Sequence, residues 1–149
     1  MKKFNFRLEK IRKYKEQLEQ NKKLKLASEQ ARHLVEQNKL SDIIYTKGKY
    51  YLMYGIRKPG KINIYNLLVA KRYIDKLSQD IVVQTEVVTS VEKNVSKAQQ
   101  ELLNASREKK KYEKLKEKHL QNFNKDMLRL ETRELDEFGS RDNRTKQLI

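Results

Sequence analysis

Apolar residues recur along the middle of the chain at alternating steps of three and four. Between Leu67 and Ala105 this spacing selects twelve positions, and eleven of them are apolar. A mean period of 3.5 residues draws one narrow stripe along a helix and favours a left-handed coiled coil with a partner helix. The intervening residues are mostly polar, so the helix should bury this stripe alone. We call these positions the second seam: Leu67, Ala70, Ile74, Leu77, Ile81, Gln84, Val88, Val91, Val95, Ala98, Leu102 and Ala105.

A weaker pattern of the same kind precedes it. Phe4, Leu8, Ile11, Lys15 and Leu18 begin a stripe, which then shifts its register and resumes at Leu24. The resumed part has six apolar residues in nine and predicts a first helix over about 4–57 that depends on its partner for stability. Its Gly48 is either a local break or a close approach of two backbones. We call these nine positions the first seam: Leu24, Ala27, Ala31, Leu34, Asn38, Ser41, Tyr45, Gly48 and Leu52.

The strongest turn signal lies between the two seams, at Pro59-Gly60. Proline disfavours a helical residue before it and glycine adopts positive φ, so we expect a turn over about 58–62. A second helix, capped by Asn63, should run over about 63–138, with a polar tail over 139–149. Helices joined by so short a turn run antiparallel. The fold class predicted for 1–138 is therefore all-α, a long antiparallel two-helix coiled coil or α-hairpin.

The turn position also predicts the register of the pair. Facing residues should have numbers that add to about 119, which places Gly48 opposite Ala70 and Phe4 beside residue 115. The second helix would then overhang the first from about Lys116 to Phe138, over roughly 35 Å. A fresh apolar stripe on this overhang predicts a partner, unless the N-terminal residues fold over it: Leu120, Phe123, Met127 and Leu130.

Composition supports helices and limits the rest. The 149 residues include one proline and four glycines, and 37% are charged, which suits long helices better than strands. Cysteine is absent, which excludes disulfides and thiolate metal sites. No apolar region follows the charged N-terminus and no window approaches the length of a membrane span. We therefore expect a cytoplasmic protein without direct membrane insertion. Because the two seams face each other within one hairpin, we also expect a monomer when free.

The net charge of +15 is unevenly distributed. Residues 1–25 carry ten Lys or Arg against three Glu, residues 107–118 carry seven against three, and residues 126–138 carry two against five acidic groups. A basic coiled coil can bind nucleic acid, anionic lipid or an acidic protein surface. No zinc motif, RNA-binding aromatic pattern or phosphate loop accompanies the charge, so we expect no nucleic acid. A basic nucleic-acid-binding or purely structural rod remains the alternative function.

Candidate chemistry is sparse. His33 and His119 have no metal-ligand spacing, and the pair Asp136-Glu137 lacks a pocket that would shift its pKa values. A two-helix hairpin offers no deep cavity, so we expect no catalytic residue, no metal, no cofactor and no enzymatic activity. Tyrosines gather near the turn, where they either anchor an interface or thicken the end of the hairpin: Tyr45, Tyr50, Tyr51, Tyr54, Tyr65 and Tyr73.

Several motifs stand in a set order along the chain. An N-terminal motif runs from Phe4 to Lys10 and is followed by Tyr14-Lys15-Glu16 and Leu26-Ala27. After the turn come Tyr73, Ile74, Leu77 and Ile81, and two C-terminal blocks follow at Arg107 to Lys111 and Leu135 to Phe138. In this order the motifs resemble the FliJ family of the bacterial flagellar type III export apparatus, over about 4–138. The tail and the high positive charge go beyond the family pattern.

This resemblance implies a non-enzymatic function. FliJ proteins are antiparallel rods similar to the gamma stalk of rotary ATPases, placed in the hexameric export ATPase FliI and in contact with the export gate protein FlhA. The implied partners also include the ATPase regulator FliH and export chaperones, at the cytoplasmic side of the membrane at the flagellar base. The ATPase-facing residues would be Arg107, Lys109, Lys110, Lys111, Phe123, Leu135, Asp136, Glu137 and Phe138. The gate-facing candidates would be Tyr45, Tyr50, Tyr73 and Leu77.

Overall fold

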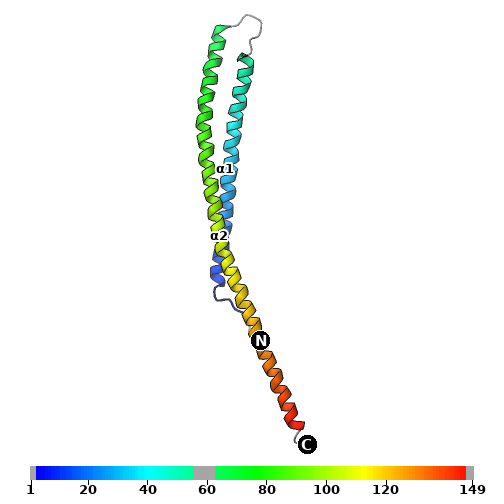
Figure 1. Ribbon diagram of the computed structural model, residues 1–149. Helices are drawn as coiled ribbons and strands as arrows, with labels where there is room; N and C mark the ends of the chain where they lie inside the picture. The colour runs from blue at the N-terminus through cyan, green and yellow to red at the C-terminus, as the bar shows by residue number, and fades with distance from the viewer. Residues whose placement is uncertain (1–2, 56–62, 147–149) are drawn as a thin grey trace. The chain divides into compact units, whose positions relative to one another are not determined.

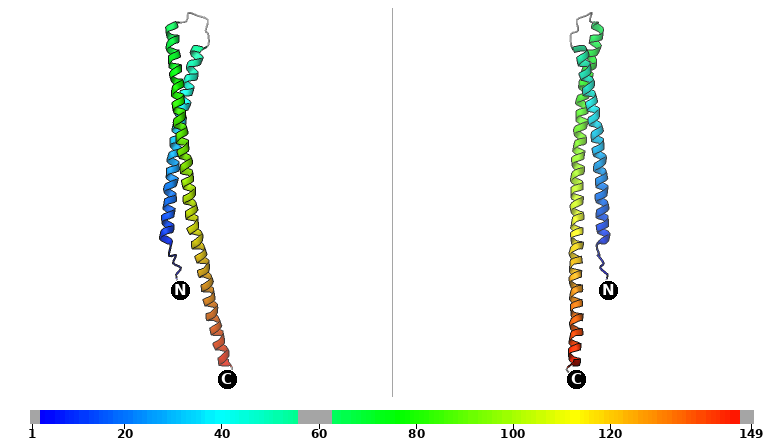
Figure 2. Two further views of the ribbon diagram at one scale, coloured as in Figure 1. Left: turned by 60° about the vertical axis from the view of Figure 1, so that its left-hand side comes forward. Right: turned by 90° about the vertical axis from the view of Figure 1, so that its right-hand side faces the viewer.

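Two long helices make up the fold. The computed structural model describes residues 3–55 and 63–146, with side chains for 3–54 and 63–139. Helix α1 spans Glu9–Gly55 and helix α2 spans Ile64–Lys146, and the described residues contain no strand. Contacts divide the chain into unit 1, Met1–Glu19 with Asn104–Ile149, and unit 2, Gln20–Leu103. Within each unit α1 and α2 lie side by side and antiparallel (Figures 1 and 2). The predicted fold class, a helical hairpin with a longer second helix, is confirmed.

The start of α1 and the end of α2 differ from the predicted ones, whereas the start of α2 agrees. There the backbone N–H of Tyr65 donates to Asn63 Oδ1 at 3.0 Å, so Asn63 caps the helix as expected. Helix α1 begins at Glu9, whose N–H bonds the carbonyl of Phe6 at 3.0 Å, not next to residue 4. Helix α2 continues past Gly139, where a tail was predicted, to Lys146. The predicted Pro59-Gly60 turn lies outside the described residues.

The second seam is confirmed as the face of α2 that packs against α1. Ala70, Leu77, Val91, Ala98 and Ala105 are buried. The other seam positions are half-buried, apart from the more exposed Leu67 at the start of the helix. Val91 is the most deeply buried large side chain of the described residues, at 1% exposure. The 3-4 spacing therefore located the core of the molecule correctly on this helix.

The prediction that the first seam packs against the second helix is wrong, because all nine of its residues are exposed. Leu34 is 58% exposed and Tyr45 is 74% exposed. A Cβ added to Gly48 would meet nothing within 4 Å, so this glycine neither breaks α1 nor marks a close approach to Ala70. The face that α1 turns to α2 in unit 2, which we call the inner face, is half-buried: Lys22, Leu26, Glu29, His33, Glu36, Leu40, Ile43, Lys47 and Tyr50.

The continuity of α1 explains this difference. A 3-4 repeat that includes Leu8 and Lys15 runs on without interruption into the inner face. The predicted first seam required a shift of register between Leu18 and Leu24, and an unbroken helix provides no such shift. An interface between only two helices is one side chain deep. Lys and Glu can therefore lay their stems along α2 while their charged ends stay in contact with water or an ionic partner.

The contacts also correct the register. In unit 2, Gln84 Nε2 donates to Glu36 Oε2 at 2.6 Å, and the rings of Tyr50 and Tyr73 lie 4.7 Å apart. The numbers of these facing residues add to 120 and 123, above the predicted 119. Gln84 bonds both the carbonyl and the carboxylate of Glu36, and Asn38 is exposed. The pairing is therefore displaced by a few residues from the one inferred from the turn.

An ionic cluster joins the helices farther along unit 2. Lys22 Nζ lies 2.8 Å and Lys25 Nζ 3.0 Å from Glu101 Oε2. Hydrogen bonds from these two ammonium groups lower the pKa of Glu101 from its ordinary 4.5 to about 2. The carboxylate is thus held ionised over a wide pH range, and it couples α1 to α2 beside the second-seam residues Ala98 and Leu102.

Candidate protein-interaction surfaces

The basic block at residues 107–111 divides into paired and solvent-facing residues. Lys109 Nζ lies 3.1 Å from Glu19 Oε2 on α1 and 3.4 Å from Glu113 Oε1. Glu19 is buried, and the bond to its carboxylate raises the pKa of Lys109. Because removal of Lys109 would leave a buried carboxylate without this partner, its main role is internal to unit 1.

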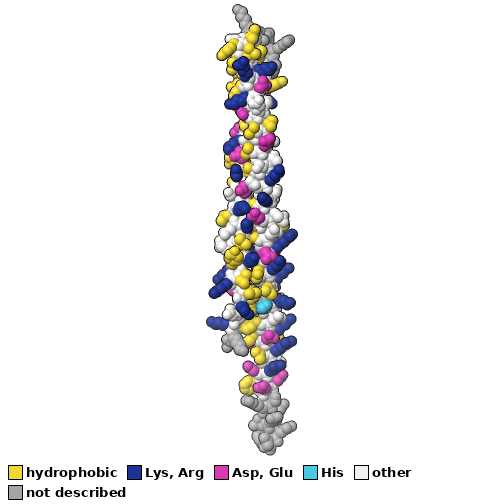
Figure 3. Space-filling view, turned by 90° about the vertical axis from the view of Figure 1, so that its left-hand side faces the viewer, with side chains coloured by type: hydrophobic (Ala, Val, Ile, Leu, Met, Phe, Trp, Pro, Cys, Tyr) yellow, Lys and Arg dark blue, Asp and Glu magenta, His cyan; other side chains and the backbone are white. Residues whose placement is uncertain are grey.

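The neighbouring basic residues offer their charge to solvent. Arg107 and Lys110 are exposed, and the exposed Lys111 pairs with Glu108 on the same helix. On the face drawn in Figure 3, Lys and Arg side chains are spread along the surface with Asp and Glu among them. Arg107 and Lys110 are therefore the residues of the block best able to bind an acidic partner.

A second ion pair anchors the start of α1 within unit 1. Lys116 Nζ lies 3.0 Å from Glu9 Oε2, and Arg12 bonds the other oxygen of Glu9 at 2.8 Å. These bonds, first that of Arg12 and then that of Lys116, lower the pKa of Glu9 from 4.5 to about 2. Lys116 was predicted to begin the overhang, whereas it pairs with the first residue of α1.

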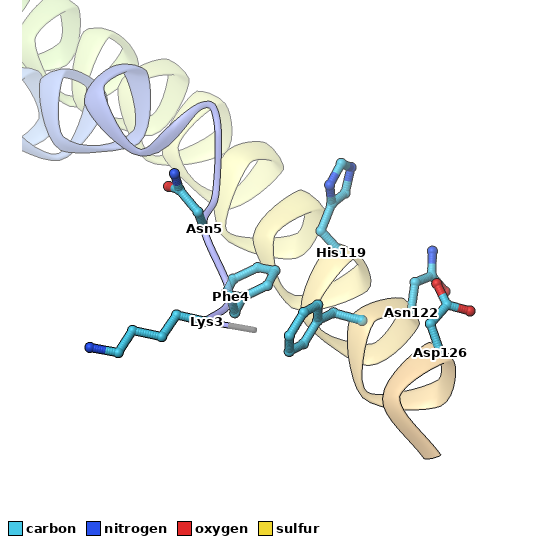
Figure 4. A pocket seen from close by; sticks show the side chains of 7 residues that line it. Lys3, Phe4, Asn5, His119, Asn122 and Asp126 are labelled. Atoms are coloured by element: carbon cyan, nitrogen blue, oxygen red, sulfur yellow. The ribbon is translucent and has the colours of Figure 1, made fainter. Parts of the chain in front are cut away.

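The N-terminal segment folds over part of the predicted overhang. The Phe4 ring lies 5.6 Å from the Phe123 ring, and Phe6, which is buried, meets the His119 ring edge-on at 5.7 Å. Figure 4 shows Phe4 reaching α2 from the segment before α1, with His119, Asn122 and Asp126 projecting from the helix. These side chains line a shallow groove of about 590 Å³. Phe123 is therefore half-covered, and His119 packs on an aromatic ring.

The uncovered part of α2 begins later than predicted. Every residue from Leu128 to Gly139 is exposed. The predicted partner-facing residues Leu135, Glu137 and Phe138 lie here with their side chains open to solvent, and Asp136 is exposed beside them. This stretch presents alternating apolar and charged groups on a helix that the described part of the N-terminal half does not cover.

The gate-facing candidates fall into three environments in unit 2. Tyr45 is among the most exposed apolar residues and lies on the side of α1 away from the inner face. Tyr50 and Tyr73 face each other between the helices, and the Tyr50 ring also stacks on Tyr54 at 6.1 Å. Leu77 is 6% exposed and packs in the second seam, so it offers no surface to a partner.

The exposed first seam is the surface that the sequence-based interpretation did not identify as such. From here on we call these nine residues, Leu24 to Leu52, the outer stripe. The signal that distinguishes it from the inner face was present in the sequence, as the uninterrupted repeat from Leu8. A count of apolar residues alone favours the outer stripe, since six of its nine residues are apolar against four of nine on the inner face.

The described residues hold no group of three or more His, Asp or Glu positioned to bind a metal ion. Within the same ranges, neither helix contains a stretch that is both long and apolar enough to cross a membrane. What the fold does present is exposed charge, exposed aromatic rings and an uncovered helix end.

A hairpin of two long helices packed side by side belongs to the class of antiparallel coiled-coil proteins. The family model described as "Flagellar FliJ protein" matches residues 4–148, so the chain belongs to the FliJ family, as the motifs predicted. It is a component of the flagellar export apparatus, and the family is a non-enzymatic one. Neither the comparison with curated proteins nor that with solved structures found a match.

Proposed function

We propose that the protein acts as the central stalk of the flagellar export ATPase. It would promote assembly and activity of the FliI hexamer, couple the ring to the export gate protein FlhA and assist export chaperones. FliH, as regulator of the ATPase, completes the proposed set of partners. This function would hold the protein at the cytoplasmic side of the membrane at the flagellar base through its partners.

The observation that carries the stalk proposal is the uncovered end of α2. Met127 is the last half-buried residue among the side chains that the structure describes, up to residue 139, and α2 continues as helix for roughly 28 Å beyond it, to Lys146. A stalk inside a ring has to contact several subunits without binding any one of them permanently. Exposed charges and scattered apolar groups suit this, because each contact is individually weak and is readily exchanged.

ATP hydrolysis by FliI, measured with and without this protein at near-physiological salt and with rings counted by negative-stain microscopy, tests the proposal. We expect faster turnover and more rings. The double variant Arg107→Glu with Lys110→Glu should weaken both effects, because it reverses the two exposed charges of the block other than Lys111, which pairs with Glu108.

The matched control is Lys93→Glu with Lys97→Glu, which makes the same charge change at exposed positions of α2 in unit 2. Lys109 is left intact in both variants because it pairs with the buried Glu19. Equal losses in the two variants would refute the basic block as the docking surface. Unchanged turnover and ring number with the unaltered protein would refute the stalk function itself.

The best candidates for contact with the export gate protein FlhA are Tyr45 and Tyr73, both exposed aromatic residues of unit 2. Aromatic side chains on a rigid helix are effective interface anchors. We expect Tyr45→Ala to weaken FlhA binding several-fold and Tyr51→Ala, a change of the same size on the same helix, to weaken it less. Binding that is insensitive to Tyr45 and Tyr73 would move the gate contact elsewhere.

A further inference from the structure

The outer stripe is a complete coiled-coil seam that lacks a partner helix among the described residues of unit 2. Its nine positions keep the 3-4 spacing over Leu24 to Leu52. At about 100° per residue, it lies on the side of α1 roughly opposite the inner face. Helix α1 therefore packs against α2 on one side and presents a second seam to solvent on the other.

The surface of the stripe already has the shape that a partner helix requires. A groove of about 440 Å³ is lined by Tyr45, Gly48, Lys49 and Leu52, with Met53 at its edge. The first four residues have the spacing i, i+3, i+4, i+7, which in coiled coils forms the hole that receives one side chain from a facing helix. Gly48 leaves the centre of this hole open, because an added Cβ would meet nothing within 4 Å.

We propose that a second copy of this chain covers the stripe, by antiparallel packing of outer stripe against outer stripe. In antiparallel coiled coils, the first of the two alternating seam positions on one helix packs against the second on the partner helix. If the numbers of facing residues add to 79, Asn38 lies opposite the partner's Ser41. The two-fold symmetry then places Ser41 opposite the partner's Asn38. These groups can hydrogen-bond at the centre, so that no buried amide is left unpaired.

The same register matches the remaining positions by size. Leu34 meets the partner's Tyr45 on both sides of the centre, and Ala31 meets the partner's Gly48, a pair small enough to let the backbones approach closely. At the edges, Lys49 lies across from Ser28 and Asp42 across from Val35, so like charges do not face each other. Eight of the nine positions of the stripe therefore find a partner position within the stripe of the second copy, and the residues that flank them bring no like charges together.

The structure removes the reason for expecting a monomer. That expectation assigned these residues to the interior of one hairpin, whereas they are on its surface. Because Tyr45 belongs to the stripe, pairing of two copies would cover it. Self-association and contact of Tyr45 with any other partner would then exclude each other.

Sedimentation equilibrium of the full-length chain over a wide concentration range tests the proposal. We expect a reversible dimer, weakened at least about tenfold by Leu34→Glu, which buries a charge only when two copies meet. Leu34 is exposed in the single chain, so the variant should keep its helicity. The matched control, Val83→Glu at a 61% exposed site on α2, should dimerise like the unaltered chain. Added salt should strengthen the dimer because it screens repulsion between two chains of +15.

Cysteine cross-linking tests the register, since the natural chain contains no cysteine. A mixture of Asn38→Cys and Ser41→Cys chains should form the mixed disulfide, and Ala27→Cys alone should form none. A chain that stays monomeric at every concentration, or a Val83→Glu variant as impaired as Leu34→Glu, would overturn the proposal. A disulfide between two Ala27→Cys chains would also overturn it, as that would indicate parallel packing or another surface.

Discussion

Truncation of one buried and one exposed residue decides which face of α1 belongs to the core. Val91→Ala removes two methyl groups from a side chain that is 1% exposed. At about 0.8 kcal/mol for each group, plus a contribution from the cavity left behind, the free energy of unfolding should fall by about 2–3 kcal/mol. Leu34→Ala removes more atoms from a residue that is 58% exposed. Its effect should stay within about 0.5 kcal/mol, because little packing is lost and alanine favours the helix.

Urea and thermal unfolding followed by circular dichroism, at a dilution where the chain is monomeric, would measure both changes. For a chain of this size the melting temperature of Val91→Ala should fall by roughly 5–10 °C, at about 2–4 °C per kcal/mol. Leu34→Ala should melt close to the unaltered protein. If Leu34→Ala costs as much as Val91→Ala, then α1 packs through the outer stripe, and the inner face described above is refuted.

Three further predictions concern other parts of the fold. Because the pKa of Glu101 is lowered to about 2, its contribution to stability is complete above about 4.5 and is lost as the pH falls towards 2, so Glu101→Gln should flatten the acid limb of a melting profile. Gly48→Ala should stabilise α1 by about 1 kcal/mol in urea unfolding, since the added methyl meets no atom. Phe6→Ala should cost about 3–5 kcal/mol and lower hydrogen-exchange protection around His119, whereas unchanged protection would show that the N-terminal segment does not pack there.

The sequence predicted α2 better than α1 for a physical reason. On α2 the residues with the strict 3-4 spacing are also the apolar ones, so periodicity and burial coincide from Ala70 to Ala105. On α1 the outer stripe has six apolar residues in nine, whereas the face against α2 has four and also contains charged groups such as Lys22 and Glu36. Hydrophobic periodicity identifies a face that can be buried, and it does not say which partner buries it.

The interaction surfaces show a similar limit. The motifs located the basic block, but Lys109 and Lys110 are adjacent in sequence and differ in role. Successive residues of a helix point about 100° apart, so one reaches Glu19 and the other faces solvent. The possibility that the N-terminal residues cover the second helix was open at the sequence level, and the Phe4–Phe123 contact shows that they do so in part. Such contacts depend on the register, which the turn position alone did not fix.

The charged residues between α1 and α2 also favour one alignment of the hairpin. In unit 1, Lys15 lies 3.8 Å from Glu108 and Glu9 lies 3.0 Å from Lys116. A slide of one heptad towards the C-terminus of α2 would place Lys15 opposite Leu115 and Glu9 opposite Phe123, so both ion pairs would be lost. An apolar seam such as that of α2 repeats every seven residues and would tolerate this slide. These ion pairs therefore disfavour a shifted alignment of a repetitive sequence, even where their contribution to stability is modest.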